Sequence, residues 1–324
     1  MRAIQVAAPG GPEALELVTL PAPAPRAGEV LVRITAVGVN FIDVYHRMGR
    51  YPLTLPFIPG QEAAGMVVDV GPGVTEFRAG DRVGWAGVLG AYAECAVVPA
   101  DRLIPLPAGV TEQQAAAALL QGMTAHYLTH DTHAIVPGDT ILIHAGAGGV
   151  GLLLTQLAKR RGARVITTVS TADKEAASRA AGADAVIPYA TTDFVAAVRH
   201  LTRDAGVRVV YDSVGGNTFE GSLDCLAPRG TLVLFGASSG PVPPLDPMLL
   251  AQHGSVFLTR PSLWDYVADR DTLRRRAAAV LGWVADGSLR LQIDRTSPLL
   301  EAARAHRDLE ARTTIGKLLL LPLP

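Results

Sequence analysis

Cysteine, lysine and unbalanced charge are scarce in this chain of 324 residues. Its two cysteines, Cys95 and Cys225, are too few for a disulfide framework or a four-thiolate zinc site. Thirty acidic and 29 basic residues leave a net charge of −1, which argues against a protein that binds nucleic acid by neutralising its backbone. Twenty-six of the basic residues are arginine, a compositional bias that decides nothing about function.

Long apolar runs are missing as well. Residues 1–20 contain no such run after a basic start, so we expect no signal peptide. The longest uncharged run, Thr140–Ala158, contains several glycines and a histidine, and fits a strand, a turn and a helix better than a membrane span. With 49% hydrophobic and 18% charged residues, the chain is expected to be a folded cytoplasmic protein of two domains.

The first third of the chain has the pattern of short β-strands. Residues Glu29–Val39 alternate apolar and polar side chains, and similar runs follow at Ala64–Val70 and Arg82–Ala86. Turn residues such as Gly71-Pro72-Gly73 separate these runs. This spacing predicts a β domain of the barrel or sandwich type.

The pattern changes at Thr111, where capping-box spacing with Gln114 predicts a helix over Ala115–Leu128. Strands and helices then alternate, which predicts a doubly wound parallel sheet. The expected strands are Thr140–Ala145, Arg164–Val169, Ala185–Pro188, Val207–Asp212, Thr231–Gly236 and Ser255–Thr259. Residues 261–324 do not continue this alternation. We therefore assign residues 1–123 and 261–324 to one domain, and residues 124–260 to a nucleotide-binding domain inserted in it.

A glycine-rich turn follows the first of these strands. Gly146, Gly148 and Gly151 form the pattern G-x-G-x-x-G between a strand and a helix. The first glycine permits a tight turn, the second lets the backbone approach a pyrophosphate, and the third lets the helix pack closely on the strand. The helix N-terminus then offers N–H groups to the phosphates. The pattern predicts dinucleotide binding; the alternative is a turn whose glycines serve helix packing alone.

The end of the second strand favours NADPH over NADH. NAD sites usually carry Asp or Glu about 20 residues after the first glycine, but this strand ends in Ser170-Thr171-Ala172. Lys174 lies one helical turn beyond and could reach a 2′-phosphate. The alternative is an ordinary helix N-cap at Ser170 or Thr171 beside a solvated lysine.

Taken together, eight motifs in this order resemble the medium-chain dehydrogenase/reductase superfamily and, within it, the zeta-crystallin-like quinone oxidoreductases. The resemblance covers essentially the whole chain. It implies a Rossmann domain inserted in a GroES-like catalytic domain, with NADPH in the cleft between them. The motifs are Gly38–Asp43, Pro59–Gly65, Gly80–Val83, Gly90–Glu94, Gln121–Ala125, His144–Gly151, Tyr211–Gly215 and Thr259–Ser262.

The resemblance also implies residues that contact the cofactor. Ala147, Gly148, Gly149 and Val150 correspond to the pyrophosphate loop. The adenosine phosphate side corresponds to Ser170, Lys174 and Tyr189, and the later strand ends to Ser213, Phe235, Gly236 and Ser238. The catalytic-domain side corresponds to Asn40, Thr124 and Arg312.

Zinc ligands are absent where the zinc alcohol dehydrogenases of this superfamily carry them. Asn40, Gln61 and Gln121 occupy those positions, and none is a good Zn²⁺ ligand. Without a Lewis acid, a substrate that accepts hydride easily is favoured, which makes quinones the first candidates. Two alternatives remain: reduction of enones or enoyl thioesters, and a non-catalytic crystallin-like role.

Three residues are the candidates for a catalytic role. Asn40 is expected to hydrogen-bond either the substrate oxygen or the nicotinamide ribose. Tyr45 and Tyr51 could line the quinone pocket, stack on the quinone or donate a proton; the alternative is that both serve packing alone.

The last Rossmann strand carries a prediction about assembly. Ser255–Thr259 is apolar and would be an exposed sheet edge in a monomer. Relatives join two sheets there through an isologous contact, so a homodimer is expected.

Overall fold

The computed structural model describes residues 1–322 and contains two compact units, which are described separately here. The first consists of Met1–Met123 and Val267–Pro324, and the second of Thr124–Tyr266. The second unit ends at Tyr266 and not at residue 260, because the short helix α8 (Leu263–Tyr266) packs within it. The Tyr266 ring stacks on Tyr127 at a centroid distance of 4.2 Å, and its hydroxyl accepts a hydrogen bond from Thr132 at 3.1 Å.

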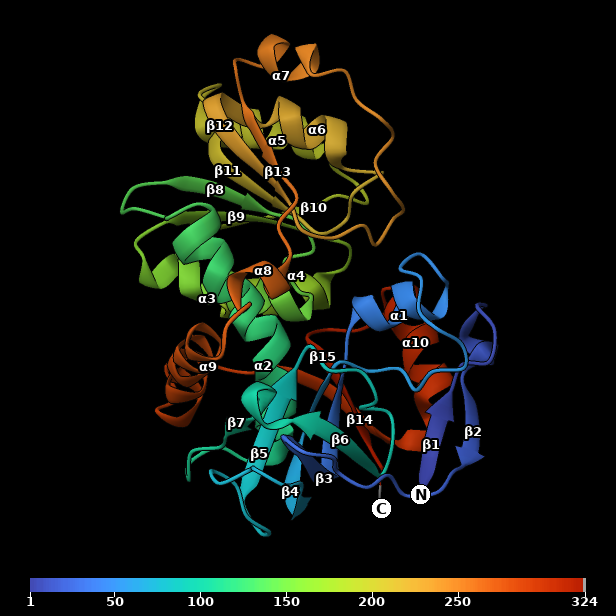
Figure 1. Cartoon of the computed structure of the whole chain (residues 1–324). Coiled ribbons are helices and arrows are strands. Elements are labelled where there is room, and N and C mark those ends of the chain that lie inside the picture. Colours follow the sequence, from blue (N-terminus) through green and yellow to red (C-terminus); the bar gives the residue numbers. More distant parts are fainter. Residues whose placement is uncertain (323–324) are drawn as a thin grey trace. The chain divides into compact units, whose positions relative to one another are not determined.

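The first unit is built on a seven-stranded sheet in the order β14-β15-β3-β4-β5-β7, with β6 paired to β3 (Figure 1). All pairs in it are antiparallel except β14 with β15. A separate hairpin-like pair, β1 with β2, completes the strands of this unit. The bounds are β1 (Arg2–Gln5), β2 (Glu16–Thr19), β3 (Glu29–Val39), β4 (Glu62–Val70), β5 (Arg82–Ala86), β6 (Cys95–Pro99), β7 (Ile104–Pro105), β14 (Ile293–Pro298) and β15 (Lys317–Leu321).

The first unit also contains helices, which lie between its strands in the sequence. Thr111 and Gln114 form the predicted capping box, with Thr111 N donating to Gln114 Oε1 at 2.9 Å and Gln114 N donating to Thr111 Oγ1 at 3.2 Å. The helix that this box caps begins at Glu112, three residues before the predicted start at Ala115, and ends at Tyr127. The bounds are α1 (Phe41–Arg47), α2 (Glu112–Tyr127), whose residues from Thr124 on belong to the second unit, α9 (Arg270–Ala285) and α10 (Ala302–Glu310), with 3₁₀ turns at Pro12–Ala14, Ala100–Arg102 and Leu299–Glu301. A π-helical turn at Leu128–Thr132 follows α2 and lies in the second unit.

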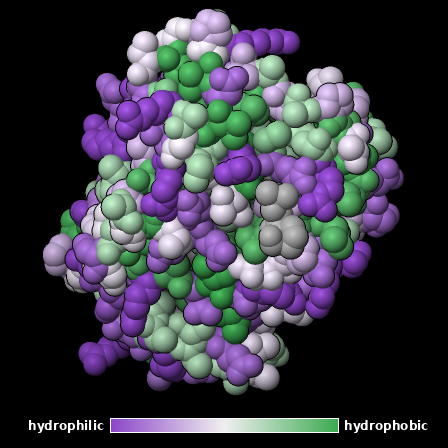
Figure 2. Space-filling model, turned by 90° about the horizontal axis from the view of Figure 1, so that it is seen from below, coloured by the Kyte–Doolittle hydropathy of each residue, from purple (hydrophilic) through white to green (hydrophobic). Residues whose placement is uncertain are grey.

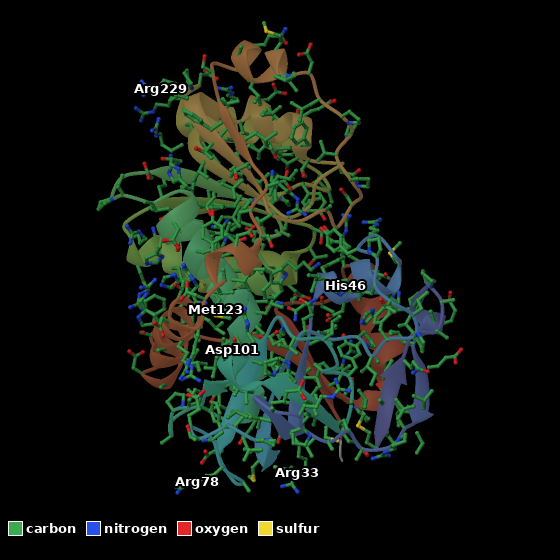
Figure 3. All side chains as sticks on the ribbon, in the orientation of Figure 1. Arg33, His46, Arg78, Asp101, Met123 and Arg229 are labelled. Carbon is green, nitrogen blue, oxygen red and sulfur yellow. The ribbon has the colours of Figure 1, made fainter. Side chains whose placement is uncertain are left out.

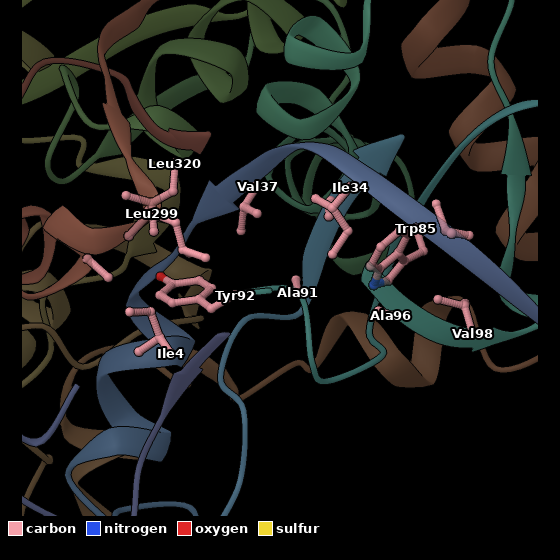
Figure 4. Packing of buried hydrophobic residues seen from close by; sticks show 14 of the residues in the cluster. Ile4, Ile34, Val37, Trp85, Ala91, Tyr92, Ala96, Val98, Leu299 and Leu320 are labelled. Carbon is pink, nitrogen blue, oxygen red and sulfur yellow. The ribbon is translucent and has the colours of Figure 1, made fainter. Parts of the chain in front are cut away.

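The core of the first unit follows from the alternation in β3. Val30, Val32 and Ile34 are buried, whereas Arg33 and Thr35 on the opposite face are exposed. Figure 3 labels Arg33 at the periphery of this unit. The buried face packs in one cluster with Trp85 and Tyr92, two of its largest side chains (Figure 4). Burial of this apolar face stabilises the sheet and fixes its register, since a slip by one residue would expose it.

The second unit contains the doubly wound sheet, and this prediction is confirmed. Its six strands are all parallel, in the order β10-β9-β8-β11-β12-β13. The strands are β8 (Thr140–Ile143), β9 (Arg164–Val169), β10 (Ala185–Pro188), β11 (Val207–Asp212), β12 (Leu226–Leu234) and β13 (Phe257–Thr259). The helices are α3 (Gly149–Arg160), α4 (Ala172–Ala180), α5 (Phe194–Thr202), α6 (Phe219–Asp224) and α7 (Met248–Gln252).

Several strand boundaries differ from the sequence prediction. β4 begins at Glu62 and not at Ala64, β8 ends at Ile143 and not at Ala145, β12 ends at Leu234 and not at Gly236, and the starts of β12 and β13 differ as well. β12 begins at Leu226, five residues before Thr231, because Leu226 pairs with Val207 ahead of a register shift. β13 begins at Phe257, because Ser255 has a left-handed φ of 57° and Val256 N is bonded to Leu250 O at 3.1 Å. The extra length of β12 comes from pairing with β11, a tertiary effect that local propensity does not contain.

The surface carries both hydrophilic and hydrophobic residues. Figure 2 shows hydrophilic and hydrophobic side chains interspersed over the face that it presents. Within residues 1–322, the helices are all too short or too polar to cross a membrane.

Candidate functional site

The glycine-rich loop joins β8 to α3, as its sequence predicts. A Cβ at Gly151 would lie 2.3 Å from Ala145 O, so the third glycine is required for close packing of the helix on the loop. At Gly148 a Cβ would meet Ala145 O at 3.2 Å and nothing else nearby. Gly148 is the N-cap of α3, and within residues 1–322 no side chain caps this helix. The first N–H groups of α3 are therefore available to a phosphate.

The predicted phosphate-side residues come together at the ends of two neighbouring strands. Lys174 Nζ donates a hydrogen bond to Ser170 Oγ at 3.3 Å. Tyr189 follows β10, and its N–H donates to Val169 O at 3.0 Å, which places its backbone beside the end of β9. Thr171 is the N-cap of α4, where Thr171 Oγ1 accepts from Lys174 N at 3.4 Å. The cap and the Ser170–Lys174 pair thus coexist.

The predicted residues at the later strand ends also gather. Ser238 N donates to Ser213 O at 3.1 Å, and Phe235 N donates to Asp212 O at 2.8 Å. A Cβ at Gly236 would lie 2.5 Å from Ser213 O, so only glycine fits there. Ser213, Phe235, Gly236 and Ser238 therefore form one compact group beyond β11 and β12.

A buried polar network holds these loops, and its centre is Asp212. The carboxylate accepts from Val214 N and Gly215 N, and from the hydroxyls of Thr218 and Ser222 at 2.7 and 2.9 Å. Because Ser222 donates to Asp212, it accepts from His144 Nε2 at 3.1 Å. Burial lowers the pKa of His144, so the ring is neutral. The network is structural support for the loops.

A second polar cluster lies in the first unit, around Asn40. The Asn40 side chain is buried at 4% exposure. Asn40 Nδ2 donates to Gly38 O at 3.1 Å and to Glu62 Oε2 at 2.8 Å, while Asn40 Oδ1 accepts from Gln121 Nε2 at 3.2 Å and from Lys317 Nζ at 2.8 Å. Both hydrogens and both lone pairs of the carboxamide are therefore used. A ligand that bonds this side chain must displace one of the four partners.

A chain of hydrogen bonds runs from Arg47 to the backbone of Asn40. Arg47 Nη1 can only donate, so His306 Nδ1 accepts from it at 3.2 Å and the ring carries its proton on Nε2. That nitrogen donates to Tyr92 OH at 2.9 Å, and Tyr92 OH donates to Asp43 Oδ2 at 3.1 Å. Asp43 Oδ2 also accepts from Asn40 N at 2.9 Å.

Electrostatics follow from the burial of this chain. Burial raises the pKa of Asp43 to about 7 and lowers the pKa of His306 to about 3. Asp43 Oδ1 has no hydrogen-bond partner in residues 1–322, which adds to the cost of ionising this carboxyl. The cluster keeps His306 neutral at ordinary pH and leaves Asp43 near its titration midpoint.

The two candidate tyrosines lie together. Tyr45 is buried in α1 and Tyr51 follows that helix with its side chain 42% exposed. Their rings meet edge to face at a centroid distance of 5.5 Å, and Arg50 lies over the Tyr45 ring at 5.6 Å. The remaining candidates lie elsewhere in the chain. Thr124 is buried in α2, and Arg312 follows α10 as an exposed residue with a φ of 56°.

Metal ligands do not gather in the described part of the chain. Within residues 1–322 there is no group of three or more His, Cys, Asp or Glu side chains that could hold a metal ion. The side-chain oxygens of Gln61 and Gln121 are buried without a hydrogen-bond partner in that range.

Comparison with known families matches both units. Residues 26–108 match the alcohol dehydrogenase GroES-like domain, and residues 149–262 match the zinc-binding dehydrogenase domain. A quinone oxidoreductase of Pseudomonas aeruginosa is 46% identical over 321 residues, which cover 98% of this chain and 99% of that protein. The chain belongs to the quinone oxidoreductase family. It is thus a medium-chain dehydrogenase/reductase, as its motifs predict, and an oxidoreductase.

Two further relatives of this chain provide information on cofactor and substrate. The crystal structure of the Escherichia coli quinone oxidoreductase, complexed with NADPH, superposes with a TM-score of 0.97 at 44% identity, covering 99% of this chain and 100% of that one. A 2-haloacrylate reductase of Burkholderia is 43% identical, covering 97% of this chain and 96% of that protein.

Sequence reasoning missed Glu62 and Lys317 as parts of the Asn40 cluster. The rarity of lysine could have drawn attention to Lys317, but no local pattern links it to Glu62 or Asn40, which lie 255 and 277 residues away in sequence. The predicted cofactor contacts and catalytic roles of the individual residues remain predictions.

Proposed function

We propose that this chain reduces quinones by hydride transfer from NADPH, without a metal ion. The observation that carries the proposal is the full-length similarity to quinone oxidoreductases, combined with a glycine loop that has kept its phosphate-binding geometry. The bound nicotinamide would supply the hydride. The protein's part is to bind the two reactants, orient them and exclude water.

The second unit fits the dinucleotide. The absence of side chains at Gly148 and Gly149 leaves the start of α3 accessible to a pyrophosphate, and Ala147 and Val150 complete the same loop. Ser170 and Lys174 present a hydroxyl and an ammonium where an NAD site would carry an acid, which supports a preference for NADPH. Tyr189 and the group around Ser213 would extend the site along the strand ends, and Thr124 and Arg312 are proposed as further cofactor contacts.

The first unit supports a reaction without zinc. The side chains of Asn40, Gln61 and Gln121 are amides and offer zinc neither a thiolate nor an imidazole. The Lys317 ammonium already places a positive charge against Asn40 and Glu62. A second cation beside that ammonium would be repelled. A substrate that needs no Lewis acid is therefore favoured.

Asn40, Tyr45 and Tyr51 are the residues that we assign to substrate and nicotinamide. The two tyrosine rings pack edge to face, and together they offer a partly exposed aromatic surface on which a flat quinone ring can stack. Either phenol can return a proton to the reduced ring, although water can do so as well.

A second candidate substrate class is supported by one specific relative. The similarity to the 2-haloacrylate reductase favours activated alkenes such as enones as alternative hydride acceptors. Enoyl thioesters belong to the same chemical class.

One assay separates these substrate classes. NADPH oxidation is followed with 1,4-benzoquinone, a naphthoquinone, a cyclic enone, 2-chloroacrylate and crotonyl thioester. We expect the highest kcat/KM with a quinone. Turnover of the alkenes with no turnover of either quinone would assign the alternative, and no turnover of any acceptor would contradict both.

We further propose that the protein is a homodimer joined through the edge of the second unit's sheet. β13 ends the strand order, and Phe257 on it is 61% exposed. An apolar edge strand of this kind invites pairing with a second copy. Light scattering should give twice the mass of the chain for the wild type and the mass of one chain for Phe257→Asp. A cytoplasmic location remains a prediction from the sequence.

A further inference from the structure

Lys317 is the least expected charged residue in the molecule. It is the first residue of β15 and only 2% exposed, although lysine is rarely buried to this extent. Its ammonium donates to Asn40 Oδ1 at 2.8 Å and to Glu62 Oε2 at 2.6 Å. Burial of this charge is tolerated because the ammonium is both paired and hydrogen-bonded.

The lysine determines which way the Asn40 carboxamide points. The oxygen and nitrogen of an amide are similar in shape, but an ammonium can only donate. The amide oxygen must therefore face Lys317, and the NH₂ group must face Gly38 O and Glu62 Oε2. A flip of the amide would place N–H donors against the ammonium.

Glu62 fixes the other side of this arrangement. It is fully buried, and its Oε1 accepts from the backbone N–H of Leu120 in α2 at 2.6 Å, while Oε2 accepts from Asn40 and Lys317. The carboxylate thereby ties strands β4 and β15 and helix α2 to the residue that precedes α1. Neither Glu62 nor Lys317 can rotate away from Asn40 without losing a hydrogen bond that involves a charged group.

One bond in the cluster is weaker than the others. The hydrogen bond from Gln121 Nε2 to Asn40 Oδ1 is the longest of the four that the carboxamide makes, at 3.2 Å, and Gln121 is only half-buried. It is also a hydrogen bond between neutral groups. A ligand donor would replace this bond first, and would then share Asn40 Oδ1 with Lys317.

We propose that Lys317 is a positioning residue that makes Asn40 a hydrogen-bond acceptor for its ligand. This inference rests on the proposed function. It distinguishes between the two partners expected for Asn40: a ribose hydroxyl of the dinucleotide can donate to Oδ1, whereas a quinone oxygen would need one of the two N–H groups that Gly38 and Glu62 already occupy.

A double-mutant cycle tests whether Lys317 acts through Asn40. The variants are Lys317→Met, Asn40→Ala and the combination, and the measurements are kcat/KM for NADPH and its Kd. We expect Lys317→Met to lower kcat/KM for NADPH about tenfold or more in the wild-type background, and less than about twofold in the Asn40→Ala background. Equal factors in both backgrounds would overturn the proposal.

A second pair of variants separates positioning from simple charge balance. Lys317→Met leaves the Glu62 charge buried alone and could fail to fold, so Lys317→Met/Glu62→Gln removes both charges together. We expect this pair variant to regain thermal stability while its kcat/KM for NADPH stays at least about tenfold below wild type. Recovery of both properties together would reduce Lys317 to a counter-charge and overturn the proposal.

Two controls keep the result interpretable. Lys159→Met makes the same substitution at a lysine whose ion pair with Asp184 is about one-third exposed, and should leave kinetics unchanged. Wild-type turnover of a quinone tests the proposed function separately. Should it be absent, the cycle is read on the Kd for NADPH by nicotinamide fluorescence, where the same loss in one background only is expected. An unchanged Kd in both Lys317→Met and Asn40→Ala would then overturn the inference.

Discussion

The two candidate binding regions, one in each unit, are built in opposite ways. In the second unit, the glycine loop offers backbone N–H groups and small residues, supported by the separate Asp212 network, and its key residues are consecutive or follow directly after strands. In the first unit, charged and amide side chains form the centre, and Lys317 reaches Asn40 across 277 residues of sequence. The arrangement in the second unit leaves backbone N–H groups for a ligand, whereas in the first unit the Asn40 carboxamide already has four hydrogen-bond partners. A ligand is therefore expected to add contacts in one unit and to replace a contact in the other.

The three lysines of the chain show the same difference in energetic terms. Lys317 is buried in an ion pair, Lys174 is half-buried beside a hydroxyl, and Lys159 lies in an ion pair whose two side chains are about one-third exposed. The contribution of each charge to stability should decrease as its solvent exposure increases, because water screens exposed pairs and leaves buried ones with their full interaction.

The largest expected effect is on stability at Lys317. Lys317→Met breaks a buried pair and leaves Glu62 uncompensated, which should lower the free energy of unfolding by about 3–5 kcal/mol. Lys159→Met at the partly exposed pair should cost about 1 kcal/mol or less. Urea denaturation of both variants checks the ratio. Similar costs at the two sites would show that burial does not separate these pairs.

The glycine loop offers a contrast within the second unit. Gly148→Ala fits the backbone, where φ is −73°, but its methyl would enter the space of the pyrophosphate. We expect the Kd for NADPH to rise about tenfold to a hundredfold, as for loss of one charge-assisted bond of roughly 1.5–3 kcal/mol, with little change in the unfolding midpoint.

The matched variant Gly151→Ala should do the reverse. Its Cβ would lie 2.3 Å from Ala145 O, so the helix must shift and the midpoint must fall even without ligand. Calorimetry with and without NADPH distinguishes the two variants. A loss of stability in Gly148→Ala as large as that in Gly151→Ala would remove the assigned division of roles.

The buried cluster of the first unit that contains Asp43 and His306 should also respond to pH. Burial lowers the pKa of His306 from 6.5 to about 3, so the unfolded chain takes up the proton first as pH falls. The stability from this neutral histidine is present above pH 6.5 and is lost progressively toward pH 3. At pH 5 the loss amounts to roughly 2 kcal/mol.

His306→Gln provides the comparison for this pH effect. The variant should show a shallower decline in the free energy of unfolding between pH 7 and pH 5 than the wild type. Asp43, whose pKa is raised to about 7, acts in the opposite direction in both proteins. Equal slopes would contradict the neutral assignment of His306.

The smallest expected effect is at Lys174. A charge-assisted contact to the 2′-phosphate would contribute about 1.5–3 kcal/mol at most, and solvent screening at this half-buried site reduces it. We expect the wild type to prefer NADPH over NADH in kcat/KM, and Lys174→Ala to lower that preference by a factor between about three and a hundred. An unchanged ratio would show that this strand end does not bind the phosphate.

Sequence reasoning succeeded where the signal is local. Strands β3, β9, β10 and β11 have the predicted bounds, because alternation and turn residues lie within each segment. The glycine loop and the hydroxyl-lysine pair at Ser170 and Lys174 are likewise encoded within a few residues.

Sequence reasoning failed where the structure depends on distant residues. The start of β12 depends on a partner strand, and the partners of Asn40 come from β4, α2 and β15. The four hydrogen-bond partners of the Asn40 amide were not predicted, and its expected contact with a ligand stays a prediction. Neither the propensity of a segment nor a motif contains that information, since it arises only when β3 pairs with β4 and β15 in the sheet of the first unit.

The central claim is metal-independent reduction of a quinone by NADPH, and one measurement tests it most directly. Protein purified without added zinc is dialysed against a chelator, its zinc content is determined, and NADPH oxidation with 1,4-benzoquinone is recorded on the same sample. The account predicts far less than one zinc atom per chain and a turnover rate that chelation does not change. A rate no higher than the uncatalysed reaction, or a rate that rises and falls with the zinc content, would contradict it.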